Sequence, residues 1–394
     1  MKLASRLSFI PFLLLIASCG GGNNASTPTG PPSGLTTTRA LVTNTFALDA
    51  TGSPSGRIEV IDDSKDVLTY QVGGIVSGIT RMLVTPDKTK TIVYGSSTRL
   101  FSLMDNSTEA FTGDFPSSQL PDFVDDFLML SDNNTVFAAV RNAPISGQTS
   151  GAVVAISVTD KTIKASIPVP HVRRLVLSHN GAKMLAFADD SNSAWVIDTA
   201  ALTATPVAGF DRATWGVFSG DDSTAYILSC GAECGGSAAA VTVLNMSTNA
   251  LGARIPVSGA TAALLDSSNL YVAGNGAGGG KLDIINTGTL AVTKSGIAIG
   301  DGFHYRMVLA SNNKLFIASR TCTTGCLSQV DTSAQTAVVS TPTGDVTGMQ
   351  PIPGRSVVYV AEGGELIIYN TTTNQPQSTQ VNLVGKASDI VLLN

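Results

Sequence analysis

The sequence is short of charged residues, and it has no basic cluster and no helical periodicity. Asp, Glu, Lys and Arg make up only 13% of the 394 residues, and the net charge is −5. An acidic chain of this kind is a poor candidate for binding nucleic acid or an anionic lipid surface. Alternation of apolar and polar residues with a period of two recurs throughout, whereas no amphipathic helical stretch of any length appears. These shortages favour an all-β protein.

The sequence also lacks the motifs of common catalytic centres. It has three histidines, no G-x-S-x-G motif of a hydrolase elbow and no C-x-x-C-H motif for covalent haem. The glycine-rich stretch 274–280 leads into a strand and not a helix, so it lacks the geometry of a phosphate-binding loop. We therefore predict no catalytic residue, no metal site and no cofactor, and the sequence favours a non-enzymatic protein without deciding the question.

The N-terminus has the pattern of an export signal. A basic segment with Lys2 and Arg6 precedes a short apolar core, and the tetrapeptide Ile-Ala-Ser-Cys ends at Cys19. The apolar core is too short to span a bilayer. The tetrapeptide resembles the lipobox of bacterial lipoproteins, which implies removal of residues 1–18 and a diacylated Cys19 at the mature N-terminus. The alternative is a simple secretory peptide followed by an ordinary thiol.

The segment that follows predicts a tether. Residues 19–38 are the acylated cysteine followed by Gly, Asn, Pro, Ser and Thr without apolar periodicity, a composition typical of a flexible linker. Gly20 after the cysteine, in place of Asp, resembles Gram-negative lipoproteins that are sent to the outer membrane. We therefore expect an outer-membrane lipoprotein that faces the periplasm or the cell surface, with the lipid on Cys19 as its contact with the membrane.

One short phrase recurs eight times along the chain. It is an alternating apolar strand that ends in Asp, Asn or Ser, followed by a tight polar turn and a second strand, and its instances are 39 to 52 residues apart. The terminal residues of the phrase are Asp62, Asp105, Ser157, Asp198, Asn245, Asn286, Asp331 and Asn370. A period near this value is typical of stacked supersecondary units. These side chains can accept a backbone N–H two residues on, so we interpret them as turn formers.

The two ends of the chain indicate how the repeats are arranged. Residues 39–46 resemble the second strand of a four-stranded unit, and residues 387–394 resemble an inner strand with nothing after it. Joining them completes a unit and removes exposed sheet edges. The sequence therefore predicts an all-β fold, a closed β-propeller over residues 39–394 with eight four-stranded blades. Seven blades are the alternative, because the second unit is irregular.

Several repeats resemble a known family. The phrases AWVIDTAALTATPV, VTVLNMSTNALGARIPV and LYVAGNGAGGGKLDIINTGTLAV resemble the YVTN-type β-propeller repeat of bacterial surface and periplasmic proteins. The SPDG turn of that family survives only in degenerate forms, at residues 85–88, 178–181 and 219–222. The resemblance implies a propeller. It carries over no catalytic motif, because the functions of the family are diverse.

The topology of a propeller indicates which face to search for a ligand. With strands A to D running outwards in each blade, the B–C and D–A connections emerge on the same face. The long connections of this sequence fall there, and we call it the long-loop face. They are residues 49–56, 142–151, 230–238 and 274–280 between B and C, and 116–126 between D and A. Recognition sites concentrate on such loops, although neutral insertion is the alternative.

Residues that begin the inner strands should line the mouth of the central channel on the long-loop face. The candidate ligand-binding residues are Arg81, Asp126, Arg173, Trp215, His304, Tyr305, Arg306 and Asp389, with Arg174 and His171 beside them. Arginine and aromatic side chains in a polar concavity can bind carboxylates, phosphates or sugars. The alternative is that these charges are simply solvated in a wet channel.

Four cysteines remain beyond Cys19, in two C-x-x-x-C pairs within predicted B–C loops. We expect disulfides between Cys230 and Cys234 and between Cys322 and Cys326, since the compartment is oxidising. A zinc site built from all four thiolates would have to span blades five and seven. We therefore favour two loop disulfides.

These observations predict a monomeric, membrane-anchored envelope lipoprotein. Its propeller would bind an envelope protein or a glycan through the long-loop face, and it would not bind nucleic acid. The alternative is a lactonase-like hydrolase that acts at the channel mouth with His304.

Overall fold

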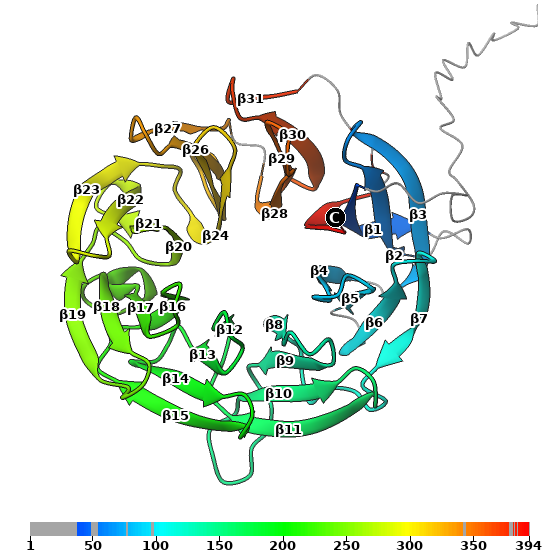
Figure 1. The fold of residues 1–394 in the computed structure, drawn as a ribbon, viewed down its shortest axis with the longest axis horizontal. Coiled ribbons are helices and arrows are strands. Elements are labelled where there is room, and N and C mark those ends of the chain that lie inside the picture. The colour runs from blue at the N-terminus through cyan, green and yellow to red at the C-terminus, as the bar shows by residue number, and fades with distance from the viewer. Residues whose placement is uncertain are drawn as a thin grey trace, which may run out of the picture.

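The computed structural model describes residues 38–394 except 49–53, 76–77, 96–97, 342–343, 378–380, 382, 384 and 394. In this part of the chain, eight four-stranded antiparallel sheets form a ring around a central channel (Figure 1). The predicted eight-bladed propeller is confirmed, and the seven-bladed alternative is wrong. The predicted signal peptide, Cys19 and the tether to residue 37 lie outside the described residues.

Each blade is numbered here by its place in the ring, and its strands run from the channel outwards. Blade 1 has β32 (Ala387–Leu392), β1 (Arg39–Leu48), β2 (Pro54–Asp62) and β3 (Val67–Ile75). Blade 2 has β4 (Ile79–Val84), β5 (Lys90–Gly95), β6 (Leu100–Asp105) and β7 (Ala110–Phe115). Blade 3 has β8 (Asp126–Met129), β9 (Thr135–Val140), β10 (Ala152–Ser157) and β11 (Thr162–Pro168). Blade 4 has β12 (Arg174–Leu177), β13 (Lys183–Phe187), β14 (Ser193–Asp198) and β15 (Thr203–Ala208).

The second half of the ring repeats this order. Blade 5 has β16 (Ala213–Phe218), β17 (Thr224–Ser229), β18 (Ala240–Asn245) and β19 (Leu251–Pro256). Blade 6 has β20 (Ala262–Asp266), β21 (Asn269–Gly276), β22 (Gly279–Asn286) and β23 (Ala291–Ala298). Blade 7 has β24 (Phe303–Ala310), β25 (Lys314–Arg320), β26 (Leu327–Asp331) and β27 (Thr336–Val339). Blade 8 has β28 (Val346–Pro351), β29 (Val357–Glu362), β30 (Glu365–Asn370) and β31 (Gln375–Pro376).

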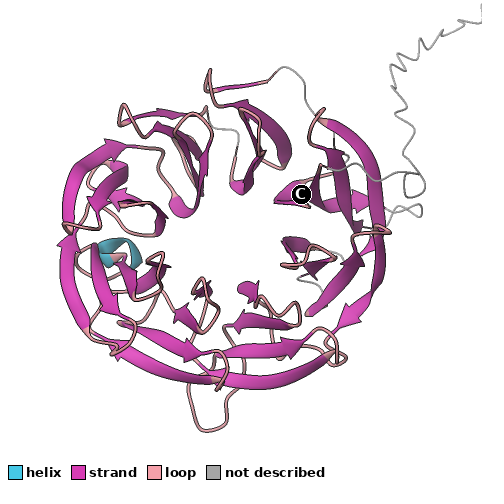
Figure 2. Cartoon of the chain, in the orientation of Figure 1, coloured by secondary structure: helices cyan, strands magenta, loops and turns pink. Residues whose placement is uncertain are grey.

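Helical structure in the described residues is confined to one short turn. It is the 3-10 helix η1 (Gly231–Cys234), which lies between β17 and β18 (Figure 2). None of the described residues forms a helix that is long and apolar enough to cross a bilayer.

The ring closes where the two ends of the chain meet. The C-terminal β32 pairs with β1 in antiparallel register, with Leu41 opposite Val391 and Val42 opposite Ile390, and Figure 1 shows the two strands side by side. The expected pairing of the terminal strands is therefore confirmed. The inner strand of blade 1 comes from the last residues of the chain and its other strands from the first.

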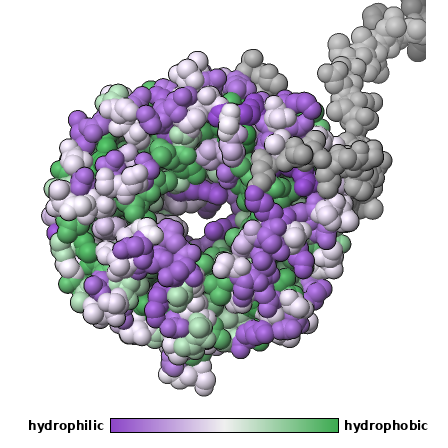
Figure 3. Space-filling model, in the orientation of Figure 1, coloured by the Kyte–Doolittle hydropathy of each residue, from purple (hydrophilic) through white to green (hydrophobic). Residues whose placement is uncertain are grey.

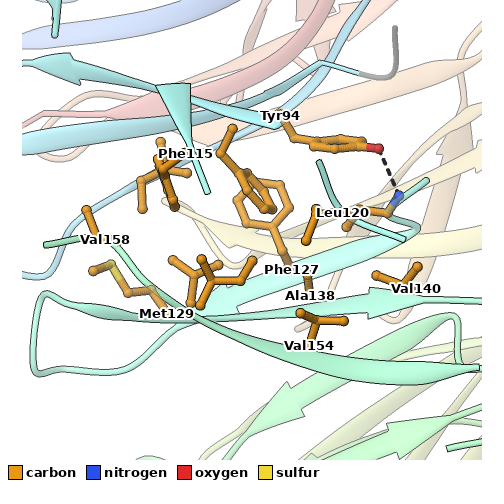
Figure 4. Close-up of a cluster of buried hydrophobic side chains, with 14 of the residues drawn as sticks. Tyr94, Phe115, Leu120, Phe127, Met129, Ala138, Val140, Val154 and Val158 are labelled. Atoms are coloured by element: carbon orange, nitrogen blue, oxygen red, sulfur yellow. Dashed lines mark hydrogen bonds between the residues drawn. The ribbon is translucent and has the colours of Figure 1, made fainter. Parts of the chain in front are cut away.

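The hydrophobic core lies between neighbouring blades. Middle strands are almost entirely buried, as β10 is, whereas outer strands such as β11 alternate between exposed and partly buried residues. Between blades 2 and 3, the ring of Phe101 packs 5.3 Å from that of Tyr94 and 5.0 Å from that of Phe127. Figure 4 shows Tyr94, Phe115 and Phe127 in this cluster. The Tyr94 hydroxyl accepts the Val124 N–H at 2.8 Å, which fixes the end of the long connection from β7 to β8. Inter-blade packing therefore also positions a loop of the long-loop face.

The recurring polar residues form the turns that the sequence predicts. The Asp105 Oδ1, for example, accepts the backbone N–H groups of Ser107 at 2.9 Å and Thr108 at 3.1 Å. Ser157 makes a variant of this turn, since its hydroxyl accepts the Asp160 N–H at 3.1 Å. The other six residues accept a backbone N–H two residues on in the same way. All eight therefore have a structural role.

One predicted loop is wrong. Residues 274–280 are not an extended B–C loop, because β21 and β22 continue until Gly276 pairs with Gly279. The turn between them is tight, and Gly278 and Gly279 have φ values of 83° and 104°, which glycine adopts without strain. The run of glycines therefore makes a hairpin and adds little to the long-loop face.

The seam between blades 8 and 1 contains an ion pair that tests ring closure. The Arg355 guanidinium contacts the Asp66 carboxylate at 2.6 Å and 2.8 Å, and the Tyr359 hydroxyl donates to the same carboxylate. Replacing Arg355 with Met leaves the carboxylate buried without its counter-charge, so we expect the free energy of unfolding to fall by about 2–4 kcal/mol. Urea unfolding followed by circular dichroism measures this. Lys164→Met, which removes the exposed pair with Asp160, should cause no measurable change.

The same pair predicts an acid dependence. Burial tends to raise the pKa of Asp66, but the hydrogen bonds from Arg355 and Tyr359 outweigh it, and the pKa lies below its usual range. A carboxyl group with a lowered folded-state pKa stabilises the protein above its unfolded value of about 3.9, and this stabilisation is lost as the pH falls through the folded value. The difference between wild type and Arg355→Met should therefore shrink on acidification. A difference that is constant from pH 7 to pH 3 would contradict this role of Asp66.

Candidate functional site

Figure 3 shows the central channel opening among hydrophilic residues. Each inner strand contributes one residue near its start, at or shortly after its first pairs with the second strand of the blade. In several blades this residue lies at or just after a β-bulge, an irregularity that re-aims side chains. In ring order from blade 1, the eight residues are Asp389, Arg81, Asp126, Arg174, Trp215, Ala262, Arg306 and Gly348.

Four of the predicted ligand-binding residues form two ion pairs across blades. Arg81 pairs with Asp126 of the next blade, and Arg306 pairs with Asp389 at 2.9 Å. Both carboxylates are buried, and each also accepts a backbone N–H of the following inner strand at 2.9 Å. These carboxylates therefore link neighbouring blades, and their charges are compensated within the protein.

The second ion pair crosses a whole blade. Blade 8 lies between Arg306 and Asp389 in the ring, and its residue at this place is Gly348. A Cβ atom on Gly348 would approach the Asp389 Cα to 3.0 Å, so glycine allows the two inner strands to pack closely. Desolvation tends to lower the pKa of Arg306, but the neighbouring Asp389 outweighs it and the pKa is raised. Desolvation lowers the pKa of Arg81 to about 10, which leaves it charged at neutral pH.

Arg173 and His171 pair with acids of the B–C loop of blade 4. The Arg173 Nη1 lies 2.6 Å from the Asp189 carboxylate, and the His171 Nδ1 lies 2.8 Å from Asp190. The His171–Asp190 pair borders an open depression of about 460 Å³. The depression is lined by Pro170, His171, Asp190, Ser191, Asn192, Trp195 and Arg212.

The structure places His304 inside the protein. Only 1% of the residue is exposed, its Nε2 lies 2.8 Å from the Gly300 carbonyl oxygen, and burial lowers its pKa. A buried, neutral imidazole bound to a backbone carbonyl stabilises the connection into β24. This placement gives no support to a hydrolase that uses His304 as its base. The third histidine, His179, pairs with Asp222 at 2.7 Å in an A–B turn of the opposite face.

Trp215 and Tyr305, the two predicted aromatic residues, are each covered by an arginine. The Arg174 guanidinium lies 5.5 Å from the centre of the Trp215 ring and 4.8 Å from that of Phe303, and it donates to the Thr261 carbonyl at 2.9 Å. The Arg320 guanidinium lies 4.2 Å from the centre of the Tyr305 ring. We call Arg174, Trp215, Phe303, Tyr305 and Arg320 the arginine–aromatic cluster. Its residues belong to blades 4, 5 and 7, so Arg174 extends along one side of the mouth.

The two arginines of this cluster differ from the others at the mouth. Among the residues that the structure describes, neither Arg174 nor Arg320 lies within 4.0 Å of a carboxylate oxygen. Desolvation lowers the pKa of Arg174 to about 10. The charge of Asp189 acts to raise this pKa, whereas the charges of Arg173 and Arg320 act to lower it further. The two guanidinium groups are thus close enough to repel each other.

Two members of the cluster are absent from the sequence-based candidates. Phe303 begins β24, and Arg320 ends β25 directly opposite it in the antiparallel register. The sequence-based candidates lie only at the starts of inner strands, whereas Arg320 lies at the end of a second strand. Pairing the predicted strands residue by residue would have placed it at the same edge.

The rim of the mouth is held by disulfides and by hydrogen bonds between loops. Cys230 is bonded to Cys234 and Cys322 to Cys326, with Cα atoms 5.7 Å and 5.4 Å apart. In η1, the Glu233 carboxylate accepts the backbone N–H and the side-chain amide of Asn275, at 2.8 Å and 2.9 Å. In the described part of the chain, no group of three His, Cys, Asp or Glu residues is placed to hold a metal ion.

Comparisons with known proteins support the fold and leave the family open. No known family model and no curated protein sequence matches the chain. The structure is similar to that of the dihydro-heme d1 dehydrogenase NirN in complex with DHE, with a TM-score of 0.70 and 12% identity over 93% of this chain and 78% of that one. It is also similar to apo AztD from Citrobacter koseri, with a TM-score of 0.58 and 12% identity over 91% and 98% of the two chains. Hydrazine synthase from Kuenenia stuttgartiensis has a TM-score of 0.53 and 14% identity over 79% and 97%. At these identities the likeness shows a β-propeller, and membership of the YVTN-repeat family stays a prediction.

The loop disulfides should stabilise the rim and not the fold. Each closes a loop of five residues, for which the chain-entropy estimate is about 2 kcal/mol. We expect the double variant Cys230→Ser/Cys234→Ser to keep its circular dichroism spectrum and to lose about 2 kcal/mol or less of unfolding free energy. Hydrogen exchange should rise at the Asn275 amide, because η1 no longer holds Glu233 in place. Loss of the folded state on removing this one disulfide would contradict the prediction, and Cys322→Ser/Cys326→Ser is the matched control for exchange at Asn275.

Proposed function

We propose that the chain is a lipid-anchored protein of the bacterial envelope whose propeller binds a ligand at the channel mouth of the long-loop face. The export signal and Cys19 support the anchor, since a cysteine at the cleavage point has little other reason to be there. An anchor through a flexible tether leaves both faces of the disc free to meet a partner. The ligand would come from the envelope, as an organic molecule, a glycan or part of a protein.

The arginine–aromatic cluster is the observation that carries the binding proposal. Elsewhere at the mouth, Arg81, Arg173 and Arg306 are paired with carboxylates. Arg174 and Arg320 lie on aromatic faces beside the open channel. The ring orients the guanidinium, and its N–H donors can then bind a group that approaches from solvent. The disulfide-closed loops hold the surroundings in place, which lowers the entropy lost on binding.

A structural neighbour supports a small organic molecule among these classes of ligand. NirN is described in complex with DHE, so a protein of similar fold can hold such a ligand. The likeness is one of fold alone, and the ligand of this chain follows from its own residues.

The lipid anchor can be tested with the full chain expressed in a Gram-negative host. We expect the wild-type protein in the outer-membrane fraction, with an N-terminal peptide that begins at Cys19 and carries the mass of a diacylglyceryl group. Cys19→Ala should abolish this mass and release the protein from the membrane fraction. A wild-type protein that begins at another residue, or that carries no lipid, would overturn this part of the proposal.

The two tryptophans of the chain provide a test of binding at the mouth. Trp215 belongs to the arginine–aromatic cluster, and Trp195 borders the separate depression in blade 4. Trp195→Phe therefore leaves one reporter at the mouth, and Trp215→Phe leaves one reporter away from it. In titrations with a panel of sugars, peptides, phosphates and organic acids, we expect at least one class to change the emission of Trp215 and to leave that of Trp195 unchanged. A panel that changes neither emission, or only that of Trp195, would contradict a ligand site at the mouth.

A further inference from the structure

We infer that the ligand of the arginine–aromatic cluster is a planar organic anion with two acidic groups, an inference that rests on the proposed function. The observation behind it is the pairing of two guanidinium groups, which have no carboxylate partner among the described residues, with three aromatic rings at one side of the channel mouth. The structure restricts the ligand in three respects, which are its charge, its shape and its number of acidic groups.

The charge of the ligand follows from the acids that face the cluster. Asp189 and Glu233 are the acids whose charges affect Arg174. Asp189 is bound at 2.6 Å by Arg173, and Glu233 is bound by two N–H groups of Asn275, so neither contacts Arg174. A neutral ligand such as a sugar would cover the two cations without compensating them, which costs free energy when their water is displaced. An anion supplies the missing charge.

The shape of the ligand follows from the aromatic rings. A compact anion such as inorganic phosphate can contact the arginines, but it makes no use of the rings of Trp215, Phe303 and Tyr305. The arginines already lie over the faces of these rings, so a flat ligand can pack against the same group of side chains while its acidic groups meet the guanidinium N–H donors. Carboxylates suit this geometry, since an arginine binds a carboxylate through two parallel N–H donors.

The number of acidic groups follows from the number of free cations. Arg174 donates one Nη1 bond to the Thr261 carbonyl, which leaves most of its five N–H donors for a ligand. Arg320 has no carboxylate within ion-pair distance in the described residues, and it is an exposed residue at the end of β25. Two acidic groups on one rigid frame satisfy both arginines and relieve the repulsion between them.

The test uses aromatic dicarboxylates as probes in the Trp195→Phe protein. Phthalate, terephthalate and naphthalene-2,6-dicarboxylate cover a range of distances between the two acidic groups. We expect at least one of them to change the emission of Trp215, with an affinity that falls as salt is added. Its dimethyl ester and inorganic phosphate should bind at least tenfold more weakly.

The matched variants are Arg174→Gln and Arg320→Gln, with Arg212→Gln as the control in the depression of blade 4. Hydrogen bonds to charged groups contribute about 1.5–3 kcal/mol, so each of the first two should weaken binding by about tenfold to a hundredfold. The control should change the affinity less than threefold. Arg174→Lys keeps the charge and removes the paired donors, so it should bind more weakly than wild type while it unfolds at the same temperature.

The outcomes separate this inference from the proposed function. If Trp215 responds to a sugar or peptide and Arg174→Gln has no effect, the mouth binds a ligand but not a planar anion, and the inference is wrong. If phosphate binds as tightly as the dicarboxylates, the aromatic rings do not select a flat ligand, and the inference is wrong. If dicarboxylates bind and both Gln variants lose affinity, the inference is supported. If no class of compound changes the emission of Trp215, both the proposed function and this inference are wrong.

Discussion

The antiparallel pairing of β1 with β32 is the interaction on which the rest of the structure depends. Each blade buries its core against its neighbours, so a ring with one open seam would expose apolar faces and unpaired strand edges on both sides. Val42 opposite Ile390 and Leu41 opposite Val391 close that seam with backbone pairing, and the side chains of Leu41, Val42 and Ile390 are buried there. Closure also determines the geometry of the mouth, since the last strand of the chain contributes Asp389 to it.

The distribution of charge at the mouth follows from this construction. Inner strands of neighbouring blades do not share a continuous hydrogen-bond ladder, so other groups must connect them at the channel. Asp126 and Asp389 do so by accepting an N–H of the next strand, and each buried carboxylate is then neutralised by an arginine from another blade. On the remaining side, the inner strands of blades 5 and 6 have Trp215 and Ala262 in the corresponding places. Arg174 therefore contacts aromatic rings and a carbonyl oxygen, whereas Arg81 and Arg306 contact carboxylates.

The fold was predictable from the sequence because its determinants are local or lie at the chain ends. The turns at Asp105 and Asn370 depend on side chains that bond N–H groups two or three residues on, and such spacing is visible in a sequence. The stretch 274–280 was mispredicted because glycine is compatible with a long loop and with a tight hairpin. The choice between them depended on how far β21 and β22 continue to pair.

The site was predictable only in part, because it depends on contacts between blades. The starts of the inner strands correctly place Arg174 and Trp215 near each other in the ring. The burial of His304 depends on how the connection before β24 packs, and the place of Arg320 depends on its register opposite Phe303. Nor does a list of charged residues show which arginines have partners, since Arg306 reaches its acid across a whole blade.

These pairings change the functional meaning of the mouth. Without the pairings, the charged residues at the mouth can be explained as ordinary solvated side chains in a wet channel. The structure divides that set into arginines paired with carboxylates and two arginines on aromatic faces that have no carboxylate partner in the part of the chain that is described. Arg174 donates one of its five N–H groups to the Thr261 carbonyl, so its orientation is fixed while most of its donors stay available. A cation that is oriented but not neutralised is the arrangement that binds an anion with little reorganisation, and this separates the arginine–aromatic cluster from the rest of the channel.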